Sequence, residues 1–540
     1  ICLALREPAG CSHRLLNLCS PLSSKVAYIL RAVRVGKPSV IFNSFQAFKS
    51  AQWTPKVAVI GAGPAGITIA RKLASANIPV VIFEAGGDSF SDESQAFYGG
   101  RTVGDPYFPL DETRLRFLGG SSNHWAGWCR LLDDEDFRPK PWVADTGWPI
   151  RRKDLTPYLD EVRGILELEP FRPDAPVSTD IRWVQLIKSN AVRFGTRYRD
   201  ELAASEHIAL VLNSYVTSLD GDGQAINALN LWSPDGQSDR FQADYVVVGT
   251  GGIENSRLLL WSNELSNGAV VPHAETLGRY WMEHPHFECG NAILNDITKF
   301  EVDADGEAFF SPSWEAMQRK GILNFGIRLV EMPYDGVKML MANLACTAPS
   351  AAEWMSEGLG QRLKCAAQLH MAWEQAPLAS NRVQLNRTMR DASGVPRIDL
   401  HWRKGPLEHQ TLIEGLRLFG QALIERDIGR VRLADWIANG EPYPFDGMEL
   451  AGNHHMGGTR ISDDPTRGVV DRDCKVHGMR NLFVGGSSVF PTSGQTNPTT
   501  TITALACRLG DHLVRRVHAD DKVSAVGGRV QSARTPVAAH

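Results

Sequence analysis

Three glycines near the start of the chain have the spacing that accommodates a phosphate group. In Gly61-x-Gly63-x-x-Gly66, the first glycine permits a tight turn, the second lets the backbone approach a pyrophosphate, and the third lets a helix pack on a strand. Glu84 follows at the end of the next apolar run, where a carboxylate can accept hydrogen bonds from ribose hydroxyls. The pattern predicts a dinucleotide site, with a glycine-rich turn without ligand as the alternative. FAD and NAD both fit it.

The glycine motif must be held by a strand before it and a helix after it. Residues 56–60 and 80–84 are short apolar runs typical of buried strands, and residues 67–76 between them have the composition of a helix. Similar strand-to-helix units recur later in the chain, which predicts a Rossmann-like parallel sheet. These later units comprise the strands 244–249 and 481–485 and the helices 254–262 and 498–518.

Two other regions have a different character. Residues 325–348 and 364–402 alternate apolar and β-branched residues, which is typical of a mainly antiparallel sheet, and a turn at 391–394 interrupts the second region. We expect an α/β (α+β overall) fold in which a Rossmann-like domain is interleaved with a substrate domain built on that sheet. The expected parts are a basic N-terminal extension (1–53), the nucleotide-binding domain (54–165, 205–290 and 445–518), the substrate domain (166–204 and 291–444) and a flexible tail (519–540).

The composition is that of a globular protein. Of 540 residues, 43% are hydrophobic and 22% are charged, and the formal net charge of -4 gives no electrostatic signature of nucleic-acid binding. No apolar run has the length of a transmembrane helix. The nine cysteines are scattered and never form a C-x-x-C pair, which argues against a disulfide framework or a zinc ribbon and favours a reducing, cytoplasmic compartment.

The first fifty-three residues differ from the rest of the chain. Seven basic side chains and several serines accompany a single acid, Glu7, and this composition resembles an organelle transit segment. An over-extended or truncated start explains the same composition. Organelle targeting is therefore an alternative to the cytoplasm, and the segment is left out of the fold prediction.

Four further motifs follow in order along the chain. They are Arg116-Phe-Leu-Gly-Gly-Ser-Ser-Asn-His-Trp125, Gly278-Arg-Tyr-Trp-Met-Glu-His-Pro-His286, His455-Met-Gly-Gly-Thr459 and Asn497-Pro-Thr-Thr500. With them, most of the chain resembles the glucose-methanol-choline (GMC) family of FAD oxidoreductases. The similarity is to the branch of pyranose oxidases and of the flavoprotein subunits of fructose and gluconate dehydrogenases. The resemblance implies FAD rather than NAD, and an oxidase or dehydrogenase acting on CH–OH groups.

The resemblance also implies which residues hold the flavin. The segment Gly119-Gly120-Ser121-Ser122 can lie flat against a ring, because glycine puts no side chain in the way. His124 matches the histidine that is covalently bound to flavin in pyranose oxidases, so a covalent bond is implied; packing near the ring is the alternative. Val216 matches the residue whose backbone holds adenine, and Gly251 would lie near the same half of the cofactor.

Hydride removal from an alcohol carbon requires a base near the hydroxyl, and histidine has a suitable pKa. In the family branch, a histidine of H-x-G-G-T and an asparagine of N-P-T face the flavin together, and His455 and Asn497 match them. His455 would accept the hydroxyl proton and Asn497 would orient the same oxygen. His454 is the alternative; adjacent residues of an extended chain point to opposite faces, so only one should reach the pocket. Without a carboxylate or cysteine at ligand spacing nearby, no metal is expected.

Pro498 and Thr499 follow this asparagine at the start of the last predicted helix. Proline is tolerated in the first helical turn and fixes where the helix begins. The positive end of the helix would then face the flavin carbonyl at which negative charge develops. An ordinary capped helix is the alternative.

Departures from the family narrow the expected substrate. Residues 251–256 lack the alanine-glycine-serine-proline signature of choline-type members, and residues 486–488 lack an aspartate that many members have. We therefore expect a secondary hydroxyl of a sugar, glycoside or polyol to be oxidised. A non-sugar alcohol, such as a sterol or natural product, and a flavin-binding protein without turnover are the alternatives. Oxygen, a quinone and a partner cytochrome are all candidate electron acceptors, and a homo-oligomer is compatible with the sequence.

Overall fold

A sheet of six parallel strands carries the glycine motif. The computed structural model describes residues 40–190, 192–294, 307–331, 367–445, 450 and 452–532, with isolated residues between 336 and 355. The strands lie in the order β1-β9-β3-β2-β13-β21, and every residue of the four inner strands is buried, as in a sheet covered on both faces. Their bounds are β1 Ile41–Phe42, β2 Val57–Ile60, β3 Val80–Phe83, β9 Ile208–Val211, β13 Tyr245–Val248 and β21 Leu482–Val484.

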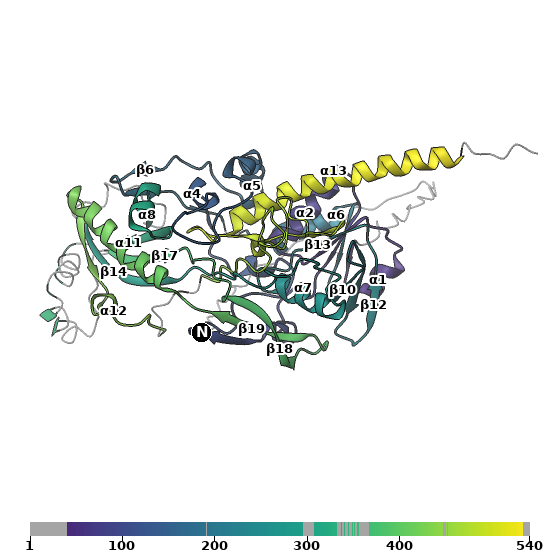
Figure 1. Cartoon of the computed structure of the whole chain (residues 1–540), viewed down its shortest axis with the longest axis horizontal. Coiled ribbons are helices and arrows are strands. Elements are labelled where there is room, and N and C mark those ends of the chain that lie inside the picture. The colour runs from purple at the N-terminus through teal and green to yellow at the C-terminus, as the bar shows by residue number, and fades with distance from the viewer. Residues whose placement is uncertain are drawn as a thin grey trace, which may run out of the picture. The chain divides into compact units, whose positions relative to one another are not determined.

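Helices pack against this parallel sheet. The longest, α13, runs beside α2 (Figure 1), and Lys72 of α2 forms an ion pair of 2.9 Å with Asp511 of α13. Gly510 lets the two helices approach closely, because a Cβ there would lie 2.7 Å from the Cβ of Lys72. The helices of this part of the chain are α1 Phe45–Ser50, α2 Pro64–Ser75, α5 Leu159–Leu166, α6 Phe194–Ala204, α7 Glu254–Leu265 and α13 Thr499–Ser532.

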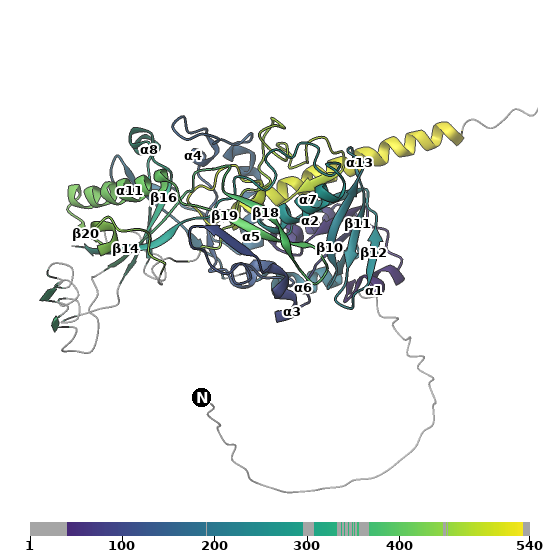
Figure 2. The same ribbon diagram turned by 60° about the horizontal axis from the view of Figure 1, so that its bottom comes forward.

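A second sheet contains seven antiparallel strands in the order β20-β14-β17-β16-β15-β7-β6. Helix α11 packs on this sheet. Gly415 allows the close approach, because a Cβ at this position would lie 2.6 Å from Met371 and 3.0 Å from Phe325. Figure 2 shows α11 beside β16. The bounds are β6 Ala175–Pro176, β7 Ile181–Val184, β14 His286–Leu294, β15 Glu307–Pro312, β16 Phe325–Glu331, β17 Ala367–Trp373, β20 Gly429–Leu433, α8 Trp314–Lys320, α11 Pro406–Glu425 and α12 Asp435–Ala438.

Three smaller sheets accompany the two large ones. One is an antiparallel sheet with the strand order β10-β11-β12, the second has the order β18-β19-β4, and the third pairs β5 with β8. Short helical turns lie between them. The bounds are β4 Arg101–Gly104, β5 Trp128–Cys129, β8 Ile187–Lys188, β10 Tyr215–Gly221, β11 Ile226–Trp232, β12 Ser238–Phe241, β18 Arg382–Arg390, β19 Pro396–Trp402, α3 Asp92–Gln95, α4 Asp134–Phe137, η1 Ala96–Tyr98, η2 Gly120–Asn123, η3 Arg152–Asp154, η4 Thr156–Tyr158 and η6 Ser487–Val489.

The fold class predicted from the sequence is confirmed, and so are the parallel strands and their helices. The structure differs from the predicted boundaries in three places. Residues 40–53 contribute β1 and α1, whose Phe45 and Phe48 are buried, so this part of the predicted extension belongs to the core around the parallel sheet. Helix α6 also packs in that core, although its residues were predicted to belong to the substrate domain. Helix α13 continues to Ser532 through the segment predicted as a tail. Residues 1–39 lie outside the described residues.

Candidate active site

A cavity of about 610 Å³ extends from the glycine motif to the histidine motif. Residues of the parallel sheet line one end, and residues of β14, β16 and β17 line the other. Most residues predicted to hold a cofactor line this cavity. These are Gly61, Gly63, Glu84, Gly120, Ser121, Ser122, His124, Val216, Gly251, Pro498 and Thr499.

Two predicted glycines, Gly66 and Gly119, shape the cavity without lining it. A Cβ on Gly66 would lie 2.0 Å from the carbonyl oxygen of Gly61, so only glycine lets α2 start this close to the turn. Gly119 has a left-handed φ of 94°, and its N–H donates to the carbonyl of Ala62 at 2.9 Å. Gly63, in contrast, has no atom within 4 Å of its Cβ position and leaves open space before the α2 N-terminus.

Glu84 stands at the carboxyl end of β3. Its carboxylate accepts hydrogen bonds from the backbone N–H groups of Ala62 and Gly86, each at 2.9 Å. Burial raises the pKa of this carboxyl group, while these two N–H groups and Arg116 act in the opposite direction. The acidic side chain is thereby fixed at the end of the cavity where the glycine turn lies.

His124 lies at the end of the short helix η2. Ser122 fixes this turn, because its hydroxyl donates to the carbonyl of Gly119 at 2.7 Å and accepts the N–H of Phe194 at 3.0 Å. Burial, and secondarily the charge of Arg193, lowers the pKa of His124, so the ring is neutral at neutral pH. A neutral imidazole thus faces the cavity beside the glycine-serine segment.

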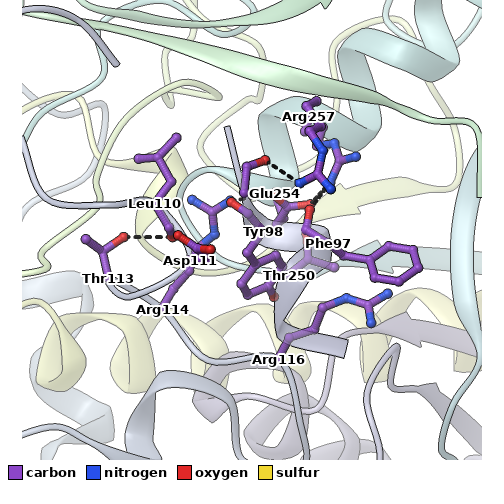
Figure 3. A network of polar contacts seen from close by, with 12 residues as sticks. Phe97, Tyr98, Leu110, Asp111, Thr113, Arg114, Arg116, Thr250, Glu254 and Arg257 are labelled. Atoms are coloured by element: carbon purple, nitrogen blue, oxygen red, sulfur yellow. Dashed lines mark hydrogen bonds and ion pairs between the residues drawn. The ribbon is translucent and has the colours of Figure 1, made fainter. Parts of the chain in front are cut away.

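A buried charge network supports the cavity near the start of α7 (Figure 3). Glu254 accepts from Arg114 at 2.9 Å and from Arg257 at 3.2 Å, and Arg257 also contacts Asp391 at 2.5 Å. Burial lowers the pKa of Arg114, which lines the cavity with Tyr98. The carboxylate of Glu254 lies between the guanidinium groups of Arg114 and Arg257. These ion pairs fix the first turn of α7, which follows Gly251 in the chain.

The structure places His454, not His455, beside Asn497. Nδ2 of Asn497 lies 3.3 Å from Nε2 of His454, and Nδ1 of His454 lies 2.8 Å from Nδ1 of His284. Burial, reinforced by neighbouring histidines, holds the pKa of His454 well below its ordinary value, so this ring is neutral near pH 7. The predicted pairing of His455 with Asn497 is therefore wrong.

His455 makes a different set of contacts. Its Nε2 lies 3.0 Å from the Tyr107 hydroxyl oxygen, and that hydroxyl donates its proton to Glu283 at 2.7 Å. Since the hydroxyl has only one proton, the Tyr107 oxygen accepts from His455, whose Nε2 must carry hydrogen. The ring also packs on Trp281, with centroids 5.6 Å apart. This nitrogen has no lone pair left to take a proton from a substrate.

Backbone pairing explains why His454, and not His455, contacts Asn497. Met456 pairs with Met282 in an antiparallel bridge, and the residues that precede Met456 point alternately to opposite sides. His454 thereby meets His284 across the bridge, while His455 turns towards Trp281. Both histidines line the cavity, so the expectation that only one of them reaches the pocket is wrong; of the two, His454 is the one in contact with Asn497.

Glu283 ties these segments together. It is 3% exposed, and its carboxylate accepts the backbone N–H groups of both His284 and His454, each at 2.8 Å, besides the Tyr107 hydroxyl. One buried carboxylate thus fixes the backbones that carry the two facing histidines.

The far end of the cavity has an aromatic wall and a polar wall. Trp128 and Phe309 pack edge to face at 5.0 Å, and His286 and His370 lie opposite with centroids 6.0 Å apart. Arg328 lines the same space. Sequence reasoning assigned no role to these residues or to His284. The only signal was the pair of histidines in the motif that ends at His286, because the other residues come from strands far apart in the chain.

No three His, Cys, Asp or Glu side chains in the described ranges are grouped so that they could hold a metal ion. In that part of the chain, no helix combines the length and apolar character needed to cross a membrane.

Comparison with known proteins gives a consistent set of similarities. Residues 377–506 match the family model described as GMC oxidoreductase. The 2-methyl-1,2-propanediol dehydrogenase of Mycolicibacterium austroafricanum is 26% identical over 85% of this chain and 95% of its own length. The C-glycoside 3-oxidase of Microbacterium trichothecenolyticum is 25% identical over 86% and 97%. The fructose dehydrogenase large subunit of Gluconobacter japonicus is 26% identical over 56% of this chain and 54% of its own length.

Among solved structures, pyridoxine 4-oxidase from Mesorbium loti has the same fold. Its TM-score is 0.52 at 15% sequence identity, and the match covers 85% of this chain and 99% of that chain.

Proposed function

Because this chain is a GMC oxidoreductase, an FAD-dependent enzyme acting on CH–OH groups, we propose that it oxidises a secondary hydroxyl of a sugar, glycoside or polyol to a carbonyl. The observation that carries the proposal is the contact of His454 with Asn497 in the same cavity as the glycine motif. An alcohol oxidation needs these groups together, since one must take the hydroxyl proton while the other holds the oxygen.

His454 is the base in this proposal. Its pKa is lowered by burial, so its ring carries no positive charge near pH 7 and has a nitrogen lone pair to offer. Nδ2 of Asn497 lies 3.3 Å from Nε2 of His454, and when the alcohol binds this amide donates instead to the oxygen that gives up its proton. His455 contributes by packing, because its Nε2 proton is committed to Tyr107.

The cavity fits FAD. Gly63 leaves open space in front of the N-terminus of α2, where unpaired backbone N–H groups favour phosphate. Glu84 stands at the next strand end for a ribose, and the N-terminus of α13 at Thr499 reaches the same cavity. When bound, FAD supplies the hydride acceptor. The chain's own residues orient the alcohol, exclude water and take its proton at Nε2 of His454.

The far end of the cavity supports a hydroxyl-rich substrate. Nε2 of Gln495 and Nε of Arg328 are buried there, and neither has a hydrogen-bond partner among the described residues. Buried donors without partners are costly, and substrate hydroxyls would satisfy them. The aromatic pair Trp128 and Phe309 offers a flat apolar wall against which a sugar ring or an aglycone can pack. A purely apolar alcohol would leave the donors unsatisfied.

We extend the proposal to covalent attachment of FAD at His124. The neutral ring of this residue lines the cavity next to Gly120, Ser121 and Ser122, which lie where the flavin is expected. Acid precipitation separates the alternatives. A yellow pellet from the unaltered protein and a colourless pellet from His124→Ala are expected, whereas a colourless pellet from both would contradict the covalent bond.

The function itself is tested by anaerobic flavin reduction. We expect the purified protein to be yellow, and its flavin absorbance to bleach with pyranoses, glycosides or polyols but not with apolar alcohols of similar size. Gln495→Leu should raise the KM for the sugar and leave the flavin content unchanged. Bleaching by apolar alcohols alone would overturn the substrate class, and a protein that cannot be reconstituted with FAD would overturn the function.

A further inference from the structure

Two histidines, His284 and His454, share a single hydrogen bond next to Asn497. Nδ1 of His284 and Nδ1 of His454 lie 2.8 Å apart, with their rings nearly perpendicular at 85°. A hydrogen bond between two ring nitrogens needs a proton on one of them and a lone pair on the other. The position of that proton determines which nitrogen of His454 can act as a base.

The two arrangements have opposite consequences. If Nδ1 of His454 carries the proton, its Nε2 has a lone pair that points towards Asn497. If Nδ1 of His284 carries it, Nε2 of a neutral His454 holds a proton and cannot accept another. Since each imidazole is neutral, each ring has only one proton to place.

The surroundings of His284 favour the first arrangement. This ring is 3% exposed, and the backbone carbonyls of Ser493 and Gly494 act to raise its pKa. Carbonyl groups accept hydrogen bonds, so they favour a proton on the nitrogen of His284 that His454 does not use. That nitrogen, Nε2, is buried and makes no hydrogen bond of normal geometry within the described residues. The proton on Nε2 leaves Nδ1 as the acceptor.

Asn497 is consistent with the same arrangement. Its Nδ2, a donor, lies 3.3 Å from Nε2 of His454, which therefore faces it as an acceptor. The opposite arrangement would put two donors against each other unless the amide were rotated. A protonated pair is disfavoured, because burial lowers the pKa of His284 to about 4 and holds that of His454 lower than usual.

We propose that His284 is a positioning residue that keeps the proton of His454 on Nδ1, so that Nε2 of His454 keeps a lone pair, which Asn497 contacts in this structure and which the substrate hydroxyl takes over when it binds. This inference rests on the proposed role of His454 as the base. Glu283 assists, because its carboxylate holds the backbone N–H groups of both histidines and so keeps the rings in register. During the reaction, the hydroxyl proton moves to Nε2 of His454, and the hydrogen bond from its Nδ1 to His284 strengthens because the donor becomes cationic.

A pair of substitutions separates this role from simple packing. In His284→Asn, the Oδ1 atom takes the approximate place of Nδ1 and still accepts from His454, whereas His284→Leu fills the space without an acceptor. We expect His284→Leu to lower the anaerobic rate of flavin reduction about 10²-fold with an unchanged KM, and His284→Asn to stay within about 5-fold of the parent. His477→Leu is the control, since that ring makes its hydrogen bond with the carbonyl of Ser462 and lies outside the cavity.

The proton itself can be located by NMR of protein labelled with 15N in histidine. The inference predicts that His454 has hydrogen on Nδ1 in the parent and in His284→Asn, and on Nε2 in His284→Leu. Hydrogen on Nε2 of His454 in the parent would overturn it, as would equal rate losses in the two variants. This measurement needs no turnover. A protein that shows the expected tautomer but oxidises no alcohol would contradict the proposed function and leave the assignment of the proton intact.

Discussion

The two ends of the cavity are built in different ways. At the glycine end, the functional groups are mostly backbone atoms, namely the N–H groups at the start of α2 and the turn that Gly66 and Gly119 permit. At the histidine end, they are side chains from separate segments, with His284, His454 and Asn497 held in one hydrogen-bonded row. Local sequence determines the first arrangement, whereas the second exists only after the chain has folded.

This difference predicts how each end responds to mutation. A backbone site fails when a side chain is added, because the added atoms displace the turn or the ligand. A side-chain site fails when an acceptor or donor is removed, or when the buried network behind it is broken. Three pairs of matched variants and one comparison across pH test this contrast.

The largest effect is expected at the base. We predict that His454→Ala lowers the rate of flavin reduction by substrate about 10³-fold, because this variant removes the group in contact with Asn497 that takes the proton. His455→Ala should reduce at a rate within about 10-fold of the parent, since its Nε2 only donates to Tyr107. Stopped-flow absorbance of the two variants, loaded equally with FAD, makes the comparison. Equal losses would refute the separation of the two histidines, and a larger loss at His455 would restore the assignment made from the motif.

A buried ion pair lies near the histidine end of the cavity. Lys140 and Glu374 are both fully buried at 3.0 Å, and Glu374 also accepts the N–H of Asn324. Removing the cation leaves a buried carboxylate without its partner, so Lys140→Met should lower the free energy of unfolding by about 3 kcal/mol. Lys49→Met, which breaks an exposed pair with Asp239, should cost less than about 1 kcal/mol. Urea denaturation measures both, and similar losses would show that the buried network is not a main support of this end.

Two glycines offer the corresponding test at the other end. A Cβ on Gly66 would overlap the carbonyl oxygen of Gly61, so Gly66→Ala should lower the free energy of unfolding by about 2 kcal/mol. Gly63→Ala meets no protein atom and should change it by less than about 0.5 kcal/mol. Its methyl group points into open space where phosphate is expected, so both variants should retain less FAD. Unimpaired FAD binding by Gly63→Ala would place the pyrophosphate elsewhere.

The contrast also explains what the sequence could predict. The strands of the parallel sheet and the helix after Gly63 followed from local runs and spacing, and the residues of that motif line one cavity. The choice between His454 and His455 could not be predicted from local spacing. It depends on the bridge between Met282 and Met456, which are far apart in the sequence.

Other elements were missed for similar physical reasons. Strand β1 has only two residues and is recognisable only by its pairing with β9, so the segment from residue 40 was assigned to the basic extension. The polar wall of the cavity comes from β14, β16 and β17, and no local pattern indicates that His286 and His370 meet. Side chains that function only through contacts between distant strands leave no signal in spacing.

The smallest effect, taken per pH unit, is expected from lowering the pH. Burial, and secondarily His370 and Arg328, lowers the pKa of His286 to about 3. In the unfolded chain a histidine binds a proton below about pH 6.5, whereas folded His286 does not until much lower pH. Between these values the unfolded state binds more protons, so the free energy of unfolding falls as pH decreases, by at most about 1.4 kcal/mol per pH unit for this residue. His286→Gln removes this contribution and should make the decline between pH 6.5 and 4 shallower, by about 1 kcal/mol per unit or less, because the ring borders the cavity. Denaturation curves at several pH values for the parent and variant measure the difference, and parallel declines would show that His286 takes up its proton as readily in the folded protein as in the unfolded chain.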